Sequence, residues 1–237
     1  MYFNKNCFDI LPTIPDKSVD LIFCDLPYVS TNCKWDCEVD LDKLWIEFKR
    51  IRKDTTPIIM TCTTKFGYEL ISSNKKEFRF DLVWQKSKKC GFLQARKRPL
   101  CNHEMVYFFY NKQPKYNYLK YHKYTKTEST KKASVITGGN LYKPKDIQRK
   151  KDTYEPKLPT SIQPFKSIKP SNHQTGKPLD LMEFILKYWS DEGDTILDPT
   201  FGGGSMPIMC KIMNRQFIGC EIDKKFYDDT MELLTKY

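Results

Sequence analysis

The chain has 237 residues, of which 40% are hydrophobic and 14% aromatic, so it can bury a core of ordinary domain size. It has no run of about 18 apolar residues that could span a bilayer, and residues 1–9 lack the basic start and apolar stretch of a signal peptide. We therefore expect a cytoplasmic protein without membrane contacts. Nine irregularly spaced cysteines favour reduced thiols over disulfides. Cys33 and Cys37 have the spacing of half a zinc clip, but no second clip matches it, so we predict no metal site.

The net charge of +11 is concentrated in two stretches. Residues 112–169 carry +11, residues 86–98 hold six basic side chains and no acid, and the rest of the chain carries −6. Basic clusters of this kind bind nucleic-acid phosphates, and the tyrosines between the lysines of the longer stretch offer stacking surfaces for bases. A solvated surface loop is the alternative interpretation. The predicted nucleic-acid contacts are Lys86, Lys88, Lys89, Arg96, Lys97, Arg98, Lys131 and Lys132.

Apolar spacing predicts an alternation of strands and helices at both ends of the chain. The expected elements are a strand over 19–24, a helix over 41–53, strands over 57–62, 78–85 and 103–110, a helix over 179–189, a strand over 195–198, a helix over 206–213, a strand over 216–221 and a helix over 226–235. Between them, residues 111–169 contain five prolines and weak periodicity, which predict a loop-rich insertion. The alternation indicates an α/β fold, with a mostly parallel sheet covered by helices on both faces.

A glycine-rich segment follows the predicted strand over 195–198. Its sequence is Asp198-Pro-Thr-Phe-Gly-Gly-Gly-Ser205, and glycines between a strand and a helix let the backbone approach a ligand closely. Pro207 stands where a dinucleotide fingerprint needs glycine, and no phosphate-loop lysine follows. Glu221 ends the next strand, near the offset of a ribose-binding acid. The segment therefore predicts a ligand that contains a ribose.

A second motif, Asp25-Leu26-Pro27-Tyr28, ends the predicted strand over 19–24, because Pro27 cannot continue it. Ligands of open α/β sheets bind at the carboxyl ends of the strands, so one crevice can hold both motifs. At this point the chain resembles the DNA amino-methyltransferases of adenine N6 and cytosine N4, in the arrangement that places the catalytic motif before the cofactor motif. The segments 172–178 and 217–223 are similar to further motifs of that family, in the same order.

The resemblance implies a Rossmann-like methyltransferase fold with S-adenosylmethionine as cofactor and duplex DNA as substrate. Residues 1–110 and 170–237 would form the catalytic domain, and residues 111–169 the target-recognition insertion. Asp25 and the Leu26 carbonyl would accept hydrogen bonds from the amine of a flipped base, next to Pro27, while Tyr28 would stack on the base. The implied cofactor residues are Asn6, Lys177, Asp198, Thr200, Phe201, Gly202, Gly204, Ser205, Glu221 and Ile222.

Two positions depart from the family pattern. Leu26 replaces the usual first proline, and Asn6 stands where the family often has an acid that binds the adenine of the cofactor. The leading prediction is a site-specific adenine-N6 methyltransferase, because cytosine enzymes of the family more often begin the catalytic motif with Ser. The alternatives are a cytosine-N4 enzyme, a methyltransferase of RNA or protein amides, and a catalytically silent DNA-binding relative. The sequence leaves open whether the active form is a homodimer and whether a cognate restriction endonuclease exists.

Overall fold

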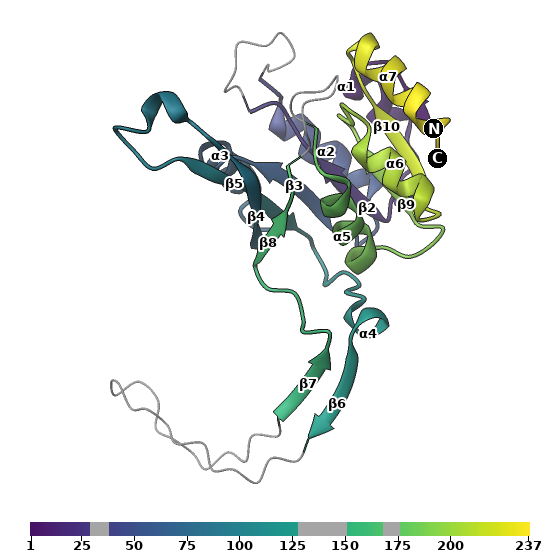
Figure 1. Ribbon diagram of the computed structural model, residues 1–237. Coiled ribbons are helices and arrows are strands. Elements are labelled where there is room, and N and C mark those ends of the chain that lie inside the picture. Colours follow the sequence, from purple (N-terminus) through teal and green to yellow (C-terminus); the bar gives the residue numbers. More distant parts are fainter. Residues whose placement is uncertain (29–37, 128–150, 168–175) are drawn as a thin grey trace. The chain divides into compact units, whose positions relative to one another are not determined.

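The computed structural model describes residues 1–28, 38–127, 151–167 and 176–237 (Figure 1). The chain divides into two compact units, one formed by Met1–Tyr116 with Ser161–Tyr237 and the other by Asn117–Thr160. Within the described ranges, no helix combines the length and the apolar character that a membrane crossing requires.

An eight-stranded sheet organises the larger unit, in the order β1-β10-β9-β2-β3-β5-β4-β8. Neighbouring strands are parallel, except that β5 runs antiparallel to both β3 and β4. The strands are β1 (Tyr2–Phe3), β2 (Leu21–Cys24), β3 (Ile58–Cys62), β4 (Phe78–Cys90), β5 (Cys101–Phe109), β8 (Ile162–Phe165), β9 (Thr195–Asp198) and β10 (Gln216–Cys220).

Helices cover both faces of this sheet. On one face, Phe48 and Leu70 pack with strand residues such as Ile58 in a single hydrophobic core. On the other face, the Trp189 ring lies 4.7 Å from that of Phe108. The α/β prediction, with a mostly parallel sheet, is therefore confirmed. The helices are α1 (Cys7–Ile10), η1 (Leu11–Thr13), α2 (Leu41–Ile51), α3 (Thr64–Ser73), η2 (Phe92–Gln94), α5 (Leu179–Trp189), α6 (Ser205–Ile212) and α7 (Lys224–Leu234).

The β4-β5 hairpin differs from the sequence prediction, which ended the first strand at residue 85. In the structure, β4 continues to Cys90, which pairs with Cys101 at the start of β5. Side chains 87–101 are all exposed. No alternation of buried and exposed residues could therefore mark this part of the strands. Backbone pairing extends them, together with hydrogen bonds between Ser167 and residues 87 and 88. We call residues 87–101 the arm; it forms the outer end of the β4-β5 hairpin (Figure 1).

The smaller unit contains α4 (Tyr118–Tyr121) and an antiparallel hairpin of β6 (Lys123–Thr127) and β7 (Lys151–Glu155). The Tyr154 ring lies 5.3 Å from Tyr124 and 6.0 Å from Tyr118, between ring centroids. These tyrosines, predicted as stacking surfaces for bases, thus pack against one another inside the unit. Strand β8 follows this unit in the chain and belongs to the large sheet.

Candidate active site

The carboxyl ends of four neighbouring parallel strands bring the two sequence motifs to one edge of the sheet. Gly219 of β10 pairs with Asp198 of β9, and Cys24 of β2 lies opposite Met60 of β3. Because β9 also pairs with β2, the chain leaves these strands at the same edge. Asp198, Glu221 and Asp25 each lie where a strand ends or just beyond it. The sheet topology therefore gathers three acidic side chains that are far apart in sequence.

The glycine-rich segment 198–205 makes a tight turn against the C-terminal helix. Gly204 has φ +80°, and a Cβ atom there would lie 2.6 Å from Cγ2 of Thr230 in α7. Both the left-handed backbone and the close approach therefore require glycine at this position. Phe201 is buried, and its ring packs against Phe217 and Tyr227. The turn is thus fixed by packing as well as by its backbone.

Glu221 links this turn to the segment that follows β10 through its two carboxylate oxygens. Oε2 accepts a 2.9 Å hydrogen bond from the Gly202 amide, and Oε1 accepts one of 2.8 Å from the Asp223 amide. The Asn4 side chain, which sequence reasoning missed, donates to the backbone carbonyls of Glu221 and Ile222 at 2.8 and 3.2 Å. The Ile222 residue itself is exposed. Glu221 therefore shapes the turn, and its burial raises the pKa of its carboxyl group above the usual value.

Asp198 is the most deeply buried acid of this edge, with 2% of its surface exposed. Its Oδ1 accepts a 3.1 Å hydrogen bond from the Thr200 amide. Burial, followed by the nearby charges of Asp25 and Glu221, raises the pKa of Asp198 well above its usual range. When ionised, these acids give a negative potential to this edge of the sheet, where the sequence predicts a ligand crevice, and this favours a cationic ligand or one that donates hydrogen bonds.

The second motif turns away from β2 with Asp25 at its centre. Asp25 Oδ1 accepts hydrogen bonds from Tyr28, at 2.6 Å, and from the Thr61 hydroxyl. The Tyr28 ring rests on Phe66, with centroids 5.6 Å apart. Burial and the charge of Asp25 raise the pKa of Tyr28 well above its usual value, so the phenol stays protonated as a donor. Leu26 is buried in the hydrophobic core and anchors the turn.

The two motifs are joined by direct hydrogen bonds. The Thr200 hydroxyl donates to the backbone carbonyl of Asp25 at 3.1 Å. The Ser205 hydroxyl donates to the Lys177 carbonyl at 2.5 Å, and the Lys177 ammonium contacts Asp25 Oδ2 at 2.5 Å. The glycine-rich turn therefore lies beside Asp25.

A chain of ion pairs leads from Asp25 to the root of the arm. Lys177, only 8% exposed, pairs with Asp25 and lies 3.7 Å from Glu104 Oε2. Glu104 Oε1 in turn pairs with Lys86 of β4. Burial lowers the pKa of Lys177, but the charges of Asp25 and Glu104 outweigh it and raise this pKa above the ordinary value. Lys177 therefore remains a cation between two carboxylates.

Several predicted residues lie in other surroundings. Asn6 is exposed, and its Oδ1 caps α1 by accepting from the Phe8 amide at 3.0 Å. The ammonium of Lys86, which is predicted to contact nucleic acid, forms an ion pair with Glu104. Lys131, Lys132 and residues 172–175 of the family-like segment 172–178 lie outside the described residues. The remaining predicted basic residues, all exposed on the arm, are Lys88, Lys89, Arg96, Lys97 and Arg98.

Two contacts, that of Asp25 with Thr61 and that of Lys177 with Glu104, left only a weak signal in the sequence. Thr61 lies near the end of β3, the strand beside β2, and its hydroxyl contacts Asp25. This contact follows from the order of the strands in the sheet, which the sequence alone does not specify. Glu104 lies beside His103 at the predicted start of a strand, where a structural pair is the favoured interpretation and a part of the base pocket the alternative. Its pairing with Lys177 depends on a contact across 73 positions of the chain, which no local pattern encodes.

Comparison with known proteins gives consistent results. A family model described as DNA methylase matches residues 19–232. The type II methyltransferase M1.MboII of Moraxella bovis is 26% identical over 98% of this chain and 95% of its own. M.HinfI of Haemophilus influenzae is 28% identical over 94% of this chain and 65% of its own.

Solved structures share the fold at lower identity. The complex of M1.HpyAVI with SAM matches with a TM-score of 0.64 at 18% identity, covering 99% of each chain. The cytosine-N4-specific PvuII DNA methyltransferase matches with a TM-score of 0.69 at 12% identity, covering 99% of this chain and 92% of its own.

Proposed function

Because the chain belongs to the DNA methylase family, we propose that it transfers a methyl group to the N6 amine of adenine at a fixed site in duplex DNA. The observation that carries this proposal is the position of Asp25. It lies at the end of β2, held by Tyr28 and Lys177, and its backbone is bonded to the glycine-rich turn through Thr200. An acceptor for an amine thus adjoins the segment that resembles a cofactor loop.

The methyl donor of this family is S-adenosylmethionine, and the residues of the crevice fit it. The molecule carries ribose hydroxyls, amino groups and a sulfonium cation, which are hydrogen-bond donors or positive charges. Asp198 and Glu221 supply negative charge at the same edge, and both carboxyl groups are in surroundings that raise their pKa values. A bound cation would offset that unfavourable charge. When bound, the cofactor supplies an electrophilic methyl group. Asp198, Phe201 and Glu221 are the side chains placed to hold it.

The amine of a base is a weak nucleophile because its lone pair is delocalised into the ring. Hydrogen-bond acceptors that hold both of its hydrogens favour the tetrahedral nitrogen that can attack. Asp25 and the Leu26 carbonyl are assigned these roles, and Tyr28 offers a ring face to a base extruded from the helix. The buried Leu26 side chain and the Phe66 contact of Tyr28 hold this turn in place before the base arrives. Much of the rate acceleration then comes from alignment of the reacting groups.

Lys177 controls the chemistry of Asp25 in this proposal. Three donors already contact the Asp25 carboxylate, from Tyr28, Thr61 and Lys177. A carboxylate with these donors still has lone-pair positions that accept a further hydrogen bond. Asp25 therefore orients the amine during methyl transfer. The methylated nitrogen is cationic when the new bond has formed, and it then releases its proton to solvent water.

Adenine is proposed over cytosine on the first residue of the catalytic motif. Asp25 stands where cytosine-N4 enzymes of the family more often have Ser. The type II naming of relatives such as M1.MboII supports a fixed recognition sequence, and a cognate restriction endonuclease is the partner that this naming suggests. The exposed cations of the arm and the basic stretch 112–169 supply the proposed phosphate contacts.

The test is incubation of the purified protein with mixed-sequence duplex DNA and labelled S-adenosylmethionine, followed by nucleoside mass spectrometry of the digested DNA. N6-methyladenine is the expected product. N4-methylcytosine as the product would show instead that the protein is a cytosine-N4 methyltransferase. The absence of both products, in a protein that binds the cofactor, would overturn the proposed reaction. Duplexes of defined sequence, compared next, identify the methylated site.

A further inference from the structure

The arm extends beyond the edge of the sheet that carries the candidate active site. Cys62, the last residue of β3, lies opposite Met105 of β5, which pairs with Val83 of β4. Strand β4 runs parallel to β3 and continues from there to Cys90. At about 3.3 Å per residue, this continuation reaches on the order of 20 Å past the end of β3. Figure 1 shows the hairpin extending away from the rest of the sheet.

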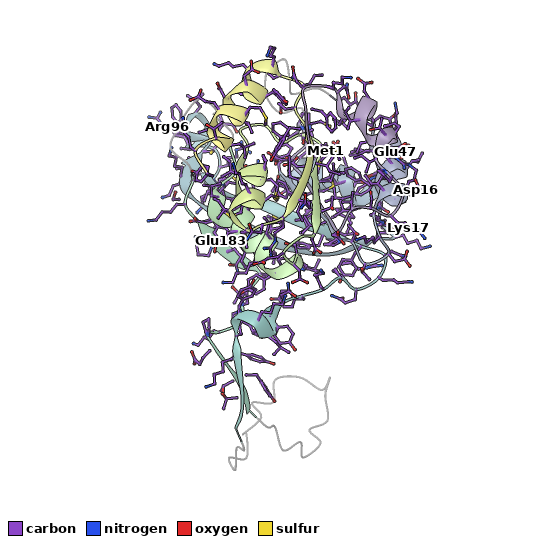
Figure 2. All side chains as sticks on the ribbon, turned by 90° about the vertical axis from the view of Figure 1, so that its right-hand side faces the viewer. Met1, Asp16, Lys17, Glu47, Arg96 and Glu183 are labelled. Carbon is purple, nitrogen blue, oxygen red and sulfur yellow. The ribbon has the colours of Figure 1, made fainter. Side chains whose placement is uncertain are left out.

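The outermost part of the arm exposes two adjacent apolar side chains among cations. Leu93 is 86% exposed and Phe92 77%, at the turn between the two strands. Residues 86–98 contain six basic side chains and no acid, and Figure 2 shows Arg96 of this segment at the margin of the molecule. These two side chains lie in water and contribute nothing to the hydrophobic core. Large apolar side chains exposed in this way are typical of a surface that binds a partner.

The root of the arm is bound to the candidate catalytic acid. Lys86 precedes the arm in β4 and pairs with Glu104 of β5, which lies next to the Lys177 that contacts Asp25. These buried ion pairs fix where the hairpin starts relative to Asp25. A duplex whose target base reaches Asp25 would therefore have its neighbouring base pairs within reach of the arm. A second copy of this chain is a less suitable partner for the arm than DNA, because two arms in contact would bring like charges together.

We propose that Phe92 and Leu93 form a wedge that enters the base stack of duplex DNA beside the target base while the cations of the arm contact the flanking phosphates. Apolar side chains inserted between bases stabilise an opened duplex, and they occupy space that an extruded base leaves. The wedge rests on the proposed function, and it adds a role for two residues that contact neither the cofactor crevice nor the core.

The test compares methylation of two duplexes by the F92A/L93A variant. One duplex is fully paired, and the other has an abasic site opposite the target base, so that its target is already unpaired. The matched control is I46A/Y68A, which removes two similarly exposed side chains, 66% and 75% exposed, from α2 and α3. Activity, as kcat/KM, is measured for each protein on each duplex.

We expect F92A/L93A to lose about tenfold or more on the paired duplex, since opening a base pair costs a few kcal/mol, and to lose less than about threefold on the abasic duplex. The control should keep its activity on both. Equal losses on the two duplexes, or no loss, would overturn the wedge. A changed oligomeric state of F92A/L93A in sedimentation equilibrium would instead assign the tip to a second copy. If the wild-type protein methylates neither duplex, the proposed function fails and the wedge with it.

Discussion

Charged residues serve opposite purposes in the crevice and in the arm. In the crevice, Asp25, Lys177 and Glu104 are largely shielded from water and paired with one another. On the arm, the basic side chains are exposed and no acid accompanies them. Buried pairs fix geometry because breaking one leaves an uncompensated charge, whereas exposed cations attract phosphates over a distance set by salt. Substitutions in the crevice should therefore change the rate of methyl transfer, and those on the arm the affinity for DNA.

Asp25→Asn should have the largest effect. The substitution keeps the volume but replaces one acceptor oxygen by a donor, which would face the amine hydrogens or the Lys177 ammonium. We expect the single-turnover methylation rate to fall by about 10²–10⁴-fold, the range associated with a positioned catalytic group, while the Kd for S-adenosylmethionine stays within about twofold. Asp54→Asn, at an exposed pair with Lys112, is the control. Retained activity in Asp25→Asn would refute the catalytic assignment.

Lys177→Gln should have the next largest effect, because it removes the cation between Asp25 and Glu104. Without this cation, two carboxylates face each other without compensation, and Asp25 loses one of the donors that hold it in place. We expect the single-turnover methylation rate to fall by about tenfold or more.

Lys177→Arg, which keeps the positive charge, is the matched control and should lose less activity than Lys177→Gln. Equal losses in the two variants would mean that Lys177 acts only through the shape of the site. Single-turnover rates of both variants, measured under the same conditions, distinguish the two results.

Asp198→Asn separates cofactor binding from stability. Burial, with the charges of Asp25 and Glu221, raises the pKa of Asp198. A raised carboxyl pKa means that the folded state loses stability as the pH rises from the ordinary value to the raised one, so the ionised group is unfavourable above that window. Asn cannot ionise and still accepts from the Thr200 amide. We expect the Tm without cofactor to rise by about 2–4 °C, and the Kd for S-adenosylmethionine to weaken by about tenfold.

Differential scanning calorimetry with and without S-adenosylmethionine checks both parts of this prediction. A lower Tm in the absence of cofactor would show that the Asp198 carboxylate stabilises the fold, contrary to its surroundings. Asp228→Asn, at an exposed pair with Lys224 in α7, controls for the loss of a surface charge.

The sequence predicted most of the sheet and both motifs because buried strands and amphipathic helices leave periodic patterns. The helix over 179–189 and the strand over 195–198 agree with the structure residue for residue. Helix α3 was missed, since Gly67 lies in its middle and weakens the helical signal. The structure explains this glycine, because a Cβ there would lie 2.6 Å from the Tyr107 ring. The arm was missed because all of its side chains are exposed, so hydrophobic and polar residues do not alternate along it. The contact of Glu104 with Lys177 was missed because a pairing between distant positions has no local sequence pattern.

The smallest effect is expected for Lys88→Gln/Lys89→Gln on the arm. Each phosphate contact that is lost should reduce the slope of log K against log salt concentration by about 0.9, with a modest loss of affinity and an unchanged single-turnover rate at saturating DNA. Lys75→Gln/Lys76→Gln is the matched control, because this exposed pair precedes β4 whereas Lys88 and Lys89 lie near its end. Fluorescence anisotropy over a range of salt concentrations measures both slopes. An equal change of slope in the two variants would mean that lysines at both ends of β4 contribute equally to DNA binding, and that the arm has no special role. An unchanged slope for Lys88→Gln/Lys89→Gln would show that these two lysines do not contact phosphates. It would also remove the support that the cations of the arm give to DNA contact by Phe92 and Leu93.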